Sequence, residues 1–410
     1  MFQFKPNIST NFNCIHCNSG STEVNSTHFL GMHTLAECLC KDCEKGFYHT
    51  YPIGHAGDFP VTFDESGKKI SFNKKAAVWF AEPLIASCFE GKNMDAIIKK
   101  KQFFETKKVV ILNCLDDCYG HVLLKLLNTQ RHLEKHPTLG LILIIPKTFL
   151  WLLPKGIAEV WFVDVPMNKL NYLINGFDAF VKGELEKFDE VYFNKAYTHL
   201  DHTKIDLSAF TKTERFDMSQ FGELKPTITF ALREDKFWLN NGLDDFLFKT
   251  CVKFKKIKYL KNYFIWKQNR LVNRVAKLIK NEIGEVDFIA TGLGKSGSIS
   301  EIIIDNRHAQ MTNEKEREWS DIYAKSHIII GVHGSNMLIP TSLAAGFIEI
   351  LPKHKIPHMA QDMLLSHSSR YAIFLGRHLD EFTNIELIKT HAVSILRDFP
   401  FLYKNTEEGK

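Results

Sequence analysis

Short apolar runs alternate with amphipathic helical stretches through most of this 410-residue chain, and this alternation restricts its fold more than any other feature. In one half the runs are VVILN, LGLILIIP, AEVWFVDVP and FDEVYFN, and in the other half they are TITFAL, VDFIAT, HIIIGV and FIEIL. Runs of this length and composition are typical of strands buried on both faces of a sheet. Because helical stretches separate many of them, they predict parallel sheets with right-handed crossover connections.

Close cysteine pairs stand near the N-terminus, outside this alternation. Four of the nine cysteines form two CxxC pairs, Cys14, Cys17, Cys40 and Cys43. A two-residue gap lets both thiolates of a pair reach one ion, and four thiolates complete a tetrahedral structural zinc site. A module this small lacks a core of its own, so the metal would supply much of its folding energy. Free thiols or a redox pair are the alternative. Other residues that could replace one of these ligands are Cys38 (in place of Cys40), His16, His28 and His33.

We therefore expect an α/β protein with two Rossmann-like domains facing a cleft, plus a small N-terminal zinc ribbon. The zinc-ribbon-like module would cover residues 1–60, the first Rossmann-like domain residues 61–221 and the second residues 222–410. Hydrophobic residues make up 45% of the chain, which suffices for sizeable cores. In open α/β sheets, ligands bind beyond the carboxyl ends of the strands. Polar residues that follow strands are therefore the candidates for a site.

The segment GVHGSN lies where one predicted strand gives way to a helix. Glycine permits a tight turn there, and a serine or asparagine can cap the helix. The exposed amides and the helix dipole would then form an anion site suited to a diphosphate, with His333 as a further hydrogen-bond donor. The alternative is a capped turn whose histidine only packs. The residues concerned are His333, Gly334, Ser335 and Asn336.

Two charged residues in the same half also require partners. Glu349 stands inside the apolar run FIEIL, where an unpartnered carboxylate would cost several kcal/mol. A ribose diol is a suitable partner, and a salt bridge to Lys353 or another cation is the alternative. Arg233 follows an apolar strand and could clamp a diphosphate in bidentate fashion. Alternatively, it pairs with Glu234 or Asp235.

Two stretches, DDCYGHVLLKLLNTQ and AKSHIIIGVHGSNMLIPTSLAAGFIEILP, resemble the family 61 glycosyltransferases. That family carries a YGH-type motif at the start of the first helix, a GVHGAGLTN-like turn and an apolar IE strand that ends in proline. The turn is two residues shorter here, and the N-terminal cysteine module is not a usual part of the family. The resemblance implies a GT-B fold that binds a nucleotide sugar mainly in the second domain. It also implies inverting transfer without a catalytic metal.

Such a transfer requires a general base to take the proton of the acceptor hydroxyl. His121, Asp117 and Asp116 would lie on the acceptor-side domain, and the motif match favours His121. The alternative is that His121 only caps or packs. Positive charge near the departing diphosphate would come from Arg233 and from the helix that follows His333. The acceptor would be a glycan or glycolipid, as in the biosynthesis of a cell-surface polysaccharide.

Charge and hydropathy bear on partners and location. Residues 252–280 contain ten Lys or Arg and no acid, which indicates either one solvated helical face or contact with an anionic membrane or acidic glycolipid. The start of the chain lacks a targeting segment, so we expect a cytoplasmic protein. It could also contact the inner face of the membrane peripherally. A net charge of +5 is only weak evidence for a nucleic-acid partner, and we expect no nucleic acid to bind. The alternative functions are a non-catalytic zinc-ribbon and Rossmann binding protein that recruits a partner or nucleic acid, and a related enzyme such as a sugar-nucleotide epimerase.

Overall fold

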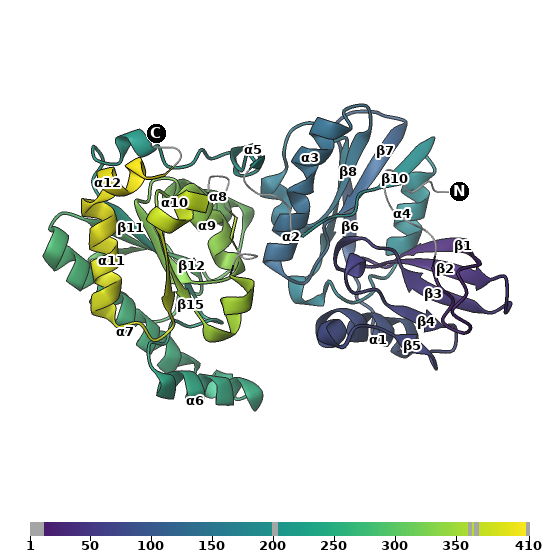
Figure 1. The fold of residues 1–410 in the computed structure, drawn as a ribbon, viewed down its shortest axis with the longest axis horizontal. Helices are drawn as coiled ribbons and strands as arrows, with labels where there is room; N and C mark the ends of the chain where they lie inside the picture. The colour runs from purple at the N-terminus through teal and green to yellow at the C-terminus, as the bar shows by residue number, and fades with distance from the viewer. Residues whose placement is uncertain (1–11, 199–203, 360–362, 365–368, 407–410) are drawn as a thin grey trace. The chain divides into compact units, whose positions relative to one another are not determined.

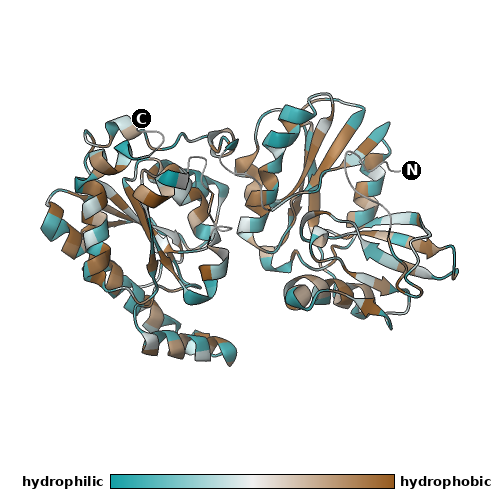
Figure 2. Ribbon diagram, in the orientation of Figure 1, coloured by the Kyte–Doolittle hydropathy of each residue, from teal (hydrophilic) through white to brown (hydrophobic). Residues whose placement is uncertain are grey.

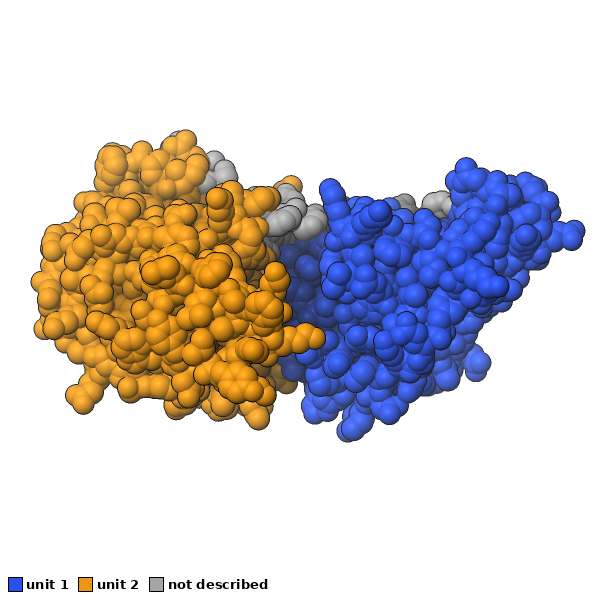
Figure 3. Space-filling view, turned by 90° about the horizontal axis from the view of Figure 1, so that it is seen from below, with its two compact units in different colours: residues 1–200 blue, residues 201–410 orange. Residues whose placement is uncertain are grey.

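The computed structural model describes residues 12–198, 204–359, 363–364 and 369–406 (Figure 1). The chain divides into two compact units, residues 1–200 and 201–410 (Figure 3). Each unit is a mixed α/β structure, as predicted, with apolar strands at the centre of each unit (Figure 2). The facing cleft of the GT-B arrangement stays a prediction.

The N-terminal sheet of unit 1 is antiparallel, and its five strands are paired in sequence order. Thr22 pairs with Cys40 at one end of the first two strands, so the turn carrying the second cysteine pair follows directly. The strands are β1 (Thr22–Phe29), β2 (Thr34–Cys40), β3 (Gly46–Thr50), β4 (Thr62–Asp64) and β5 (Ile70–Ser71).

The second sheet of unit 1 has the order β10-β7-β8-β9-β6, in which β6 alone runs antiparallel to its neighbour. Every residue of β8 is buried, as its continuous apolar run predicts. The strands are β6 (Ile97–Gln102), β7 (Lys108–Asn113), β8 (Gly140–Pro146), β9 (Glu159–Asp164) and β10 (Glu190–Phe193). The helices of this unit are α1 (Glu82–Glu90), α2 (Tyr119–Leu126), α3 (Asn128–Lys135) and α4 (Phe177–Leu185).

The antiparallel sheet is packed directly on the parallel one. The side-chain amide of Asn113 donates to the carbonyl of Gly31 at 2.7 Å, and the amide of Gly54 donates to the carbonyl of Lys195 at 2.7 Å. The rings of Phe29 and Phe193 stack with centroids 5.7 Å apart. The two sheets of unit 1 therefore share a buried contact.

Unit 2 contains a fully parallel sheet with the order β13-β12-β11-β14-β15-β16. Counted from its first strand, this is the order 3-2-1-4-5-6 of dinucleotide-binding folds, which bind ligands where the order reverses, here between β11 and β14. The strands are β11 (Thr227–Arg233), β12 (Asp287–Leu293), β13 (Ile303–Asp305), β14 (Ile328–Val332), β15 (Phe347–Leu351) and β16 (Gly376–Asp380). The helices are α5 (Ser208–Thr211), α6 (Gly242–Lys253), α7 (Ile257–Ile283), α8 (Asn313–Tyr323), α9 (Leu338–Leu343), α10 (Ser369–Phe374), α11 (Ile385–Arg397) and α12 (Phe399–Lys404).

Among the described residues, none of the helices combines the length and the apolar character that a membrane span requires.

Candidate functional site

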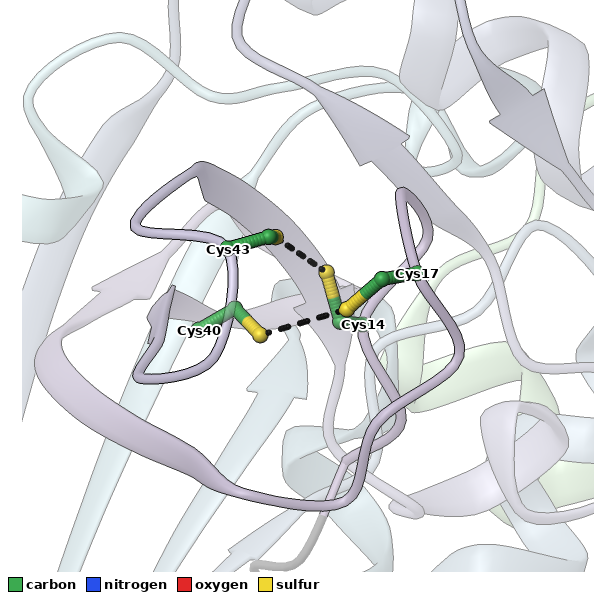
Figure 4. A group of neighbouring side chains, drawn as sticks. All are labelled: Cys14, Cys17, Cys40 and Cys43. Atoms are coloured by element: carbon green, nitrogen blue, oxygen red, sulfur yellow. Dashed lines mark hydrogen bonds between the residues drawn. The ribbon is translucent and has the colours of Figure 1, made fainter.

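The four predicted cysteines come together at the edge of the antiparallel sheet (Figure 4). Sγ of Cys14 lies 3.6 Å from Sγ of Cys43, and Sγ of Cys17 lies 3.6 Å from Sγ of Cys40. All four sulfur atoms lie within 4.8 Å of one another. A tetrahedral ion with metal–sulfur bonds of about 2.3 Å places its sulfurs about 3.8 Å apart. These cysteines could therefore hold a metal ion.

Two similar turns present these thiols. The amide of Asn18 donates to the carbonyl of Cys14 at 2.8 Å, and the amide of Glu44 donates to the carbonyl of Cys40 at 2.9 Å. Asn18 and Glu44 both adopt left-handed backbone, with φ of 62° and 54°. Burial would raise the pKa of Cys40, but hydrogen bonds from the backbone amides of Cys43 and Asp42 outweigh it and lower the pKa to about 7.

Cys43 behaves in the opposite way. Burial, reinforced by the neighbouring thiols of Cys17, Cys40 and Cys14, raises its pKa to about 12. A cation among the sulfurs would offset this repulsion and favour the thiolate of Cys43.

The other residues considered as ligands lie outside this group. Cys38 is buried in β2, where burial raises its pKa to about 12 and its thiol faces the carbonyl of Ala36. Three histidines have partners elsewhere: His16 with the carbonyl of Gly46, His28 with Glu37, and His33 against the ring of Phe80.

A second cluster surrounds Asp116, which follows β7 and is fully buried. Its Oδ1 lies 3.0 Å from Nδ1 of His121, and its Oδ2 lies 2.7 Å from Nζ of Lys125 and 3.2 Å from Nε2 of His55. Burial alone would raise the pKa of Asp116, but the charge of Lys125, the hydrogen bond with His121 and the nearby imidazole of His55 hold it well below its usual value. Asp116 is therefore a buried, ionised carboxylate.

His121 stands in the first turn of α2, with its side chain 34% exposed. Because Nδ1 faces Asp116, Nε2 is the ring nitrogen that can accept a proton from a bound molecule.

Asp117 follows Asp116 in the chain and accepts a hydrogen bond from the side-chain amide of Asn171 at 3.4 Å. Burial and the negative charge of Asp116 raise the pKa of Asp117 to about 6. His121 and Asp117, two of the residues predicted as bases, thus both lie next to the buried carboxylate of Asp116.

His55, Asp116 and His121 approach one another closely enough to hold a metal ion. However, the ammonium group of Lys125 already contacts Oδ2 of Asp116, and it would repel a second cation at that oxygen. We therefore interpret the cluster as a hydrogen-bonded network. Sequence reasoning missed His55 and Lys125, since His55 comes from a short 3-10 turn (Gly54–Gly57) in a segment without a motif.

His33 makes the stability of unit 1 sensitive to acid. Burial, followed by the charge of Lys125, lowers its pKa from 6.5 to about 3. His33 therefore takes up a proton near pH 6.5 in the unfolded chain but only near pH 3 in the folded chain. The free energy of unfolding is thus fully retained above pH 6.5 and falls as the pH drops toward 3. Between pH 7.5 and 5.5 the free energy of unfolding should fall by about 1 kcal/mol because of His33. Urea unfolding of His33→Leu should show a correspondingly smaller loss than the parent chain. The partly exposed His136, replaced in the same way, is the control; an equal loss in parent and His33→Leu would contradict the assignment.

In unit 2, the sheet brings His333 and Glu349 together, and it adds His378 from β16, which lies beside Glu349 in the strand register. Oε2 of Glu349 is hydrogen-bonded to Nδ1 of His333 and lies 3.2 Å from Nε2 of His378. Burial would raise the pKa of Glu349, but the hydrogen bond with His333 and the nearby imidazole of His378 outweigh it and lower the pKa. Two imidazoles, rather than Lys353, thus stabilise this buried carboxylate.

A pocket of about 210 Å³ opens beside His333. It lies past the ends of β11 and β14, where the strand order reverses. Nε1 of Trp238, in its wall, is buried and has no hydrogen-bond partner among the described residues. The wall also contains the basic residues Lys236, Lys249, His354 and Lys355, the apolar residues Phe237, Leu239, Phe248, Val332, Ile350 and Pro352, and the acids Asp245 and Glu381.

The turn after β14 differs from the prediction in its capping. Ser335 and Asn336 form one 3-10 turn (Ser335–Met337) before α9, and neither side chain caps a helix. Helix α9 has only six residues, so its dipole is weak. Gly334 has a φ of 147°, and a methyl group built on it would lie 3.8 Å from Nζ of Lys236. The positive charge next to this turn is thus a lysine side chain.

Arg233, at the end of β11, adopts the alternative arrangement. Its Nε donates to Oδ1 of Asp235 at 2.7 Å, and its Nη2 donates to the other carboxylate oxygen. In this structure its guanidinium group is therefore engaged by an acid two residues away.

In comparisons with known proteins, no family model, no curated protein and no solved structure matched the chain.

Proposed function

We propose that this protein is a glycosyltransferase that moves a sugar from a nucleotide sugar to a hydroxyl of a glycan or glycolipid. The observation that carries the proposal is the pairing of His121 with the buried, ionised Asp116. Such a carboxylate holds an imidazole in one tautomer and stabilises the cation that forms when the ring takes a proton. The resemblance of the YGH segment to family 61 glycosyltransferases supports the same role for His121.

In the proposed reaction, a lone pair of the acceptor oxygen forms a bond to the anomeric carbon, and the bond from that carbon to the diphosphate breaks. The acceptor proton passes to Nε2 of His121, and the nucleoside diphosphate leaves with the bonding pair. Attack from the face opposite the leaving group inverts the anomeric centre. Asp117, with its raised pKa, is the second candidate for the base.

The donor would bind in the pocket of unit 2. Its position where the strand order reverses is the usual ligand position in this type of sheet. The lysines around it suit a diphosphate, and its volume of about 210 Å³ suits one part of a nucleotide sugar rather than the whole. We assign Glu349 the role of orienting His333 toward this pocket, in place of the predicted contact with a ribose.

We further propose that the four clustered cysteines bind zinc in a structural role. Four thiolates fill a tetrahedral shell and leave no open position for a substrate.

Replacing Glu349 by glutamine should weaken nucleotide binding about tenfold, because the amide cannot hold His333 as the carboxylate does. Calorimetric titration with a panel of nucleotide sugars and nucleoside diphosphates measures the effect. The matched control is Glu301→Gln, the same substitution at an exposed position outside the His333–Glu349–His378 cluster. If none of these nucleotides binds the parent chain, the proposed function is wrong. If nucleotides bind the parent chain and Glu349→Gln with the same affinity, only the role assigned to Glu349 is wrong.

The cysteine cluster favours one alternative, a non-catalytic protein that recruits a partner or nucleic acid. Salt-dependent binding of DNA or RNA without any nucleotide binding would support it. Release of nucleoside diphosphate together with a modified acceptor would instead distinguish transfer from epimerisation of the sugar nucleotide.

A further inference from the structure

Helix α6 and the first turns of α7, whose ribbons are labelled in Figure 1, carry exposed apolar side chains in unit 2. Leu243 is 84% exposed, Phe246 71%, Phe254 63% and Tyr259 72%. The opposite sides of the two helices pack against each other and against Phe237 and Leu239 in a small core of their own. The exposed side chains are therefore surplus to the packing that holds the two helices in place.

Lysines lie beside two of these apolar side chains, Phe254 and Tyr259. Nζ of Lys258 lies 5.0 Å from the ring centre of Tyr259, and Nζ of Lys253 lies 6.0 Å from that of Phe254. The lysines in question are Lys253, Lys255, Lys256 and Lys258, and none of them forms an ion pair with an acid in the part of the chain that the structure describes. Their charge is therefore available to an anionic partner.

The same character continues along α7. Tyr259, Tyr263, Trp266 and Arg270 recur at helical spacing on one side of the helix, and the guanidinium of Arg270 lies 5.3 Å from the ring centre of Trp266. Trp266 and Arg270 also line a groove of about 650 Å³ whose wall contains four cations and no acid. The cations are Arg270, Arg274, Lys277 and Lys280.

We propose that α6 and the first half of α7 dock this protein on the surface of an anionic lipid bilayer. Aliphatic and aromatic side chains beside lysines are the composition of helices that lie in the membrane interface. Lysine stems can extend so that the ammonium groups reach the lipid phosphates. A second copy of the chain would bring like charges together at this surface. Nucleic acid would leave the aliphatic side chains of Leu243 and of Val252, which is also exposed, without a partner.

Vesicle sedimentation of the full chain tests the proposal independently of any transferase activity. We expect vesicles with 30% phosphatidylglycerol to retain at least about tenfold more protein than pure phosphatidylcholine vesicles, with a strong dependence on salt. Both Leu243→Ser with Phe246→Ser and the quadruple Lys→Gln variant at positions 253, 255, 256 and 258 should lose that excess. Phe401→Ser and Ile304→Ser change other apolar residues of unit 2 that are more than 60% exposed, and these variants should keep the excess.

Circular dichroism would verify that each variant remains folded. Equal sedimentation with both vesicle types would overturn the proposal, as would full retention by both α6–α7 variants. Light scattering that shows a dimer in the parent chain and a monomer in the Leu243→Ser, Phe246→Ser variant would assign the surface to a second copy instead. Tighter binding to RNA than to the anionic vesicles would also overturn it.

Discussion

Replacing His121 by alanine should lower kcat for sugar transfer by about 10²–10⁴-fold, the usual contribution of a positioned general base. The nucleotide affinity should stay unchanged, because the pocket proposed to bind the donor is lined by residues of unit 2. The measurement is the release of nucleoside diphosphate in the presence of acceptor, with nucleotide affinity followed separately by calorimetry. A loss confined to KM would mean that His121 binds the acceptor without acting as its base.

The control for this change must leave Asp116 intact. Removing that carboxylate would strand the buried ammonium of Lys125, at a cost of about 3–5 kcal/mol, and so would confuse catalysis with folding. His136→Ala is a better match, because it removes from the same unit a partly exposed imidazole that has no contact with Asp116 among those described above. Its kcat should equal that of the parent chain.

Replacing Cys40 by serine should abolish metal binding and lower the stability of unit 1 by about 4 kcal/mol, or roughly 10 °C in Tm. The reason is that three thiols cannot saturate a tetrahedral ion, and the two cysteine turns then lose the link between them. Elemental analysis should find one zinc per parent chain and none in Cys40→Ser, with thermal unfolding recorded on both.

Cys88→Ser serves as the matched control, since Cys88 is partly buried in unit 1 but lies outside the cluster. It should keep its metal and most of its stability. A parent chain purified without chelators that contains no metal, or a Cys40→Ser chain that unfolds at the parent temperature, would disprove a structural metal here.

The parts that sequence could predict are those encoded by neighbouring residues. The continuous apolar run of β8 predicts a buried strand, and this prediction is confirmed. The two CxxC pairs predict a cysteine cluster, and the four sulfur atoms do lie close enough together to hold a metal ion. The partners of Asp116 and Glu349 are different. His55 reaches Asp116 across 61 positions of sequence, and His378 reaches Glu349 through the pairing of adjacent strands. No local pattern carries such contacts, because they depend on the order of strands in the sheet.

The turn after His333 was predicted as a capped helix and is a 3-10 turn followed by six helical residues. Its sequence contains good capping residues, but Asn336 instead directs its side-chain amide toward the carbonyl of Val332. Capping propensity is a local preference, and the contacts of a strand end can override it.

The contact between the two sheets of unit 1 has a consequence for protein engineering. His55 contacts Asp116, and the amide of Gly54 donates a hydrogen bond to the carbonyl of Lys195. The cysteine-bearing sheet is therefore not a domain that can be removed separately. A shortened chain that starts after Ser71 would lack one of the three groups around Asp116 and would expose apolar surface on the parallel sheet. Grafting or domain exchange in this protein should therefore cut at a point beyond unit 1 and never between its two sheets.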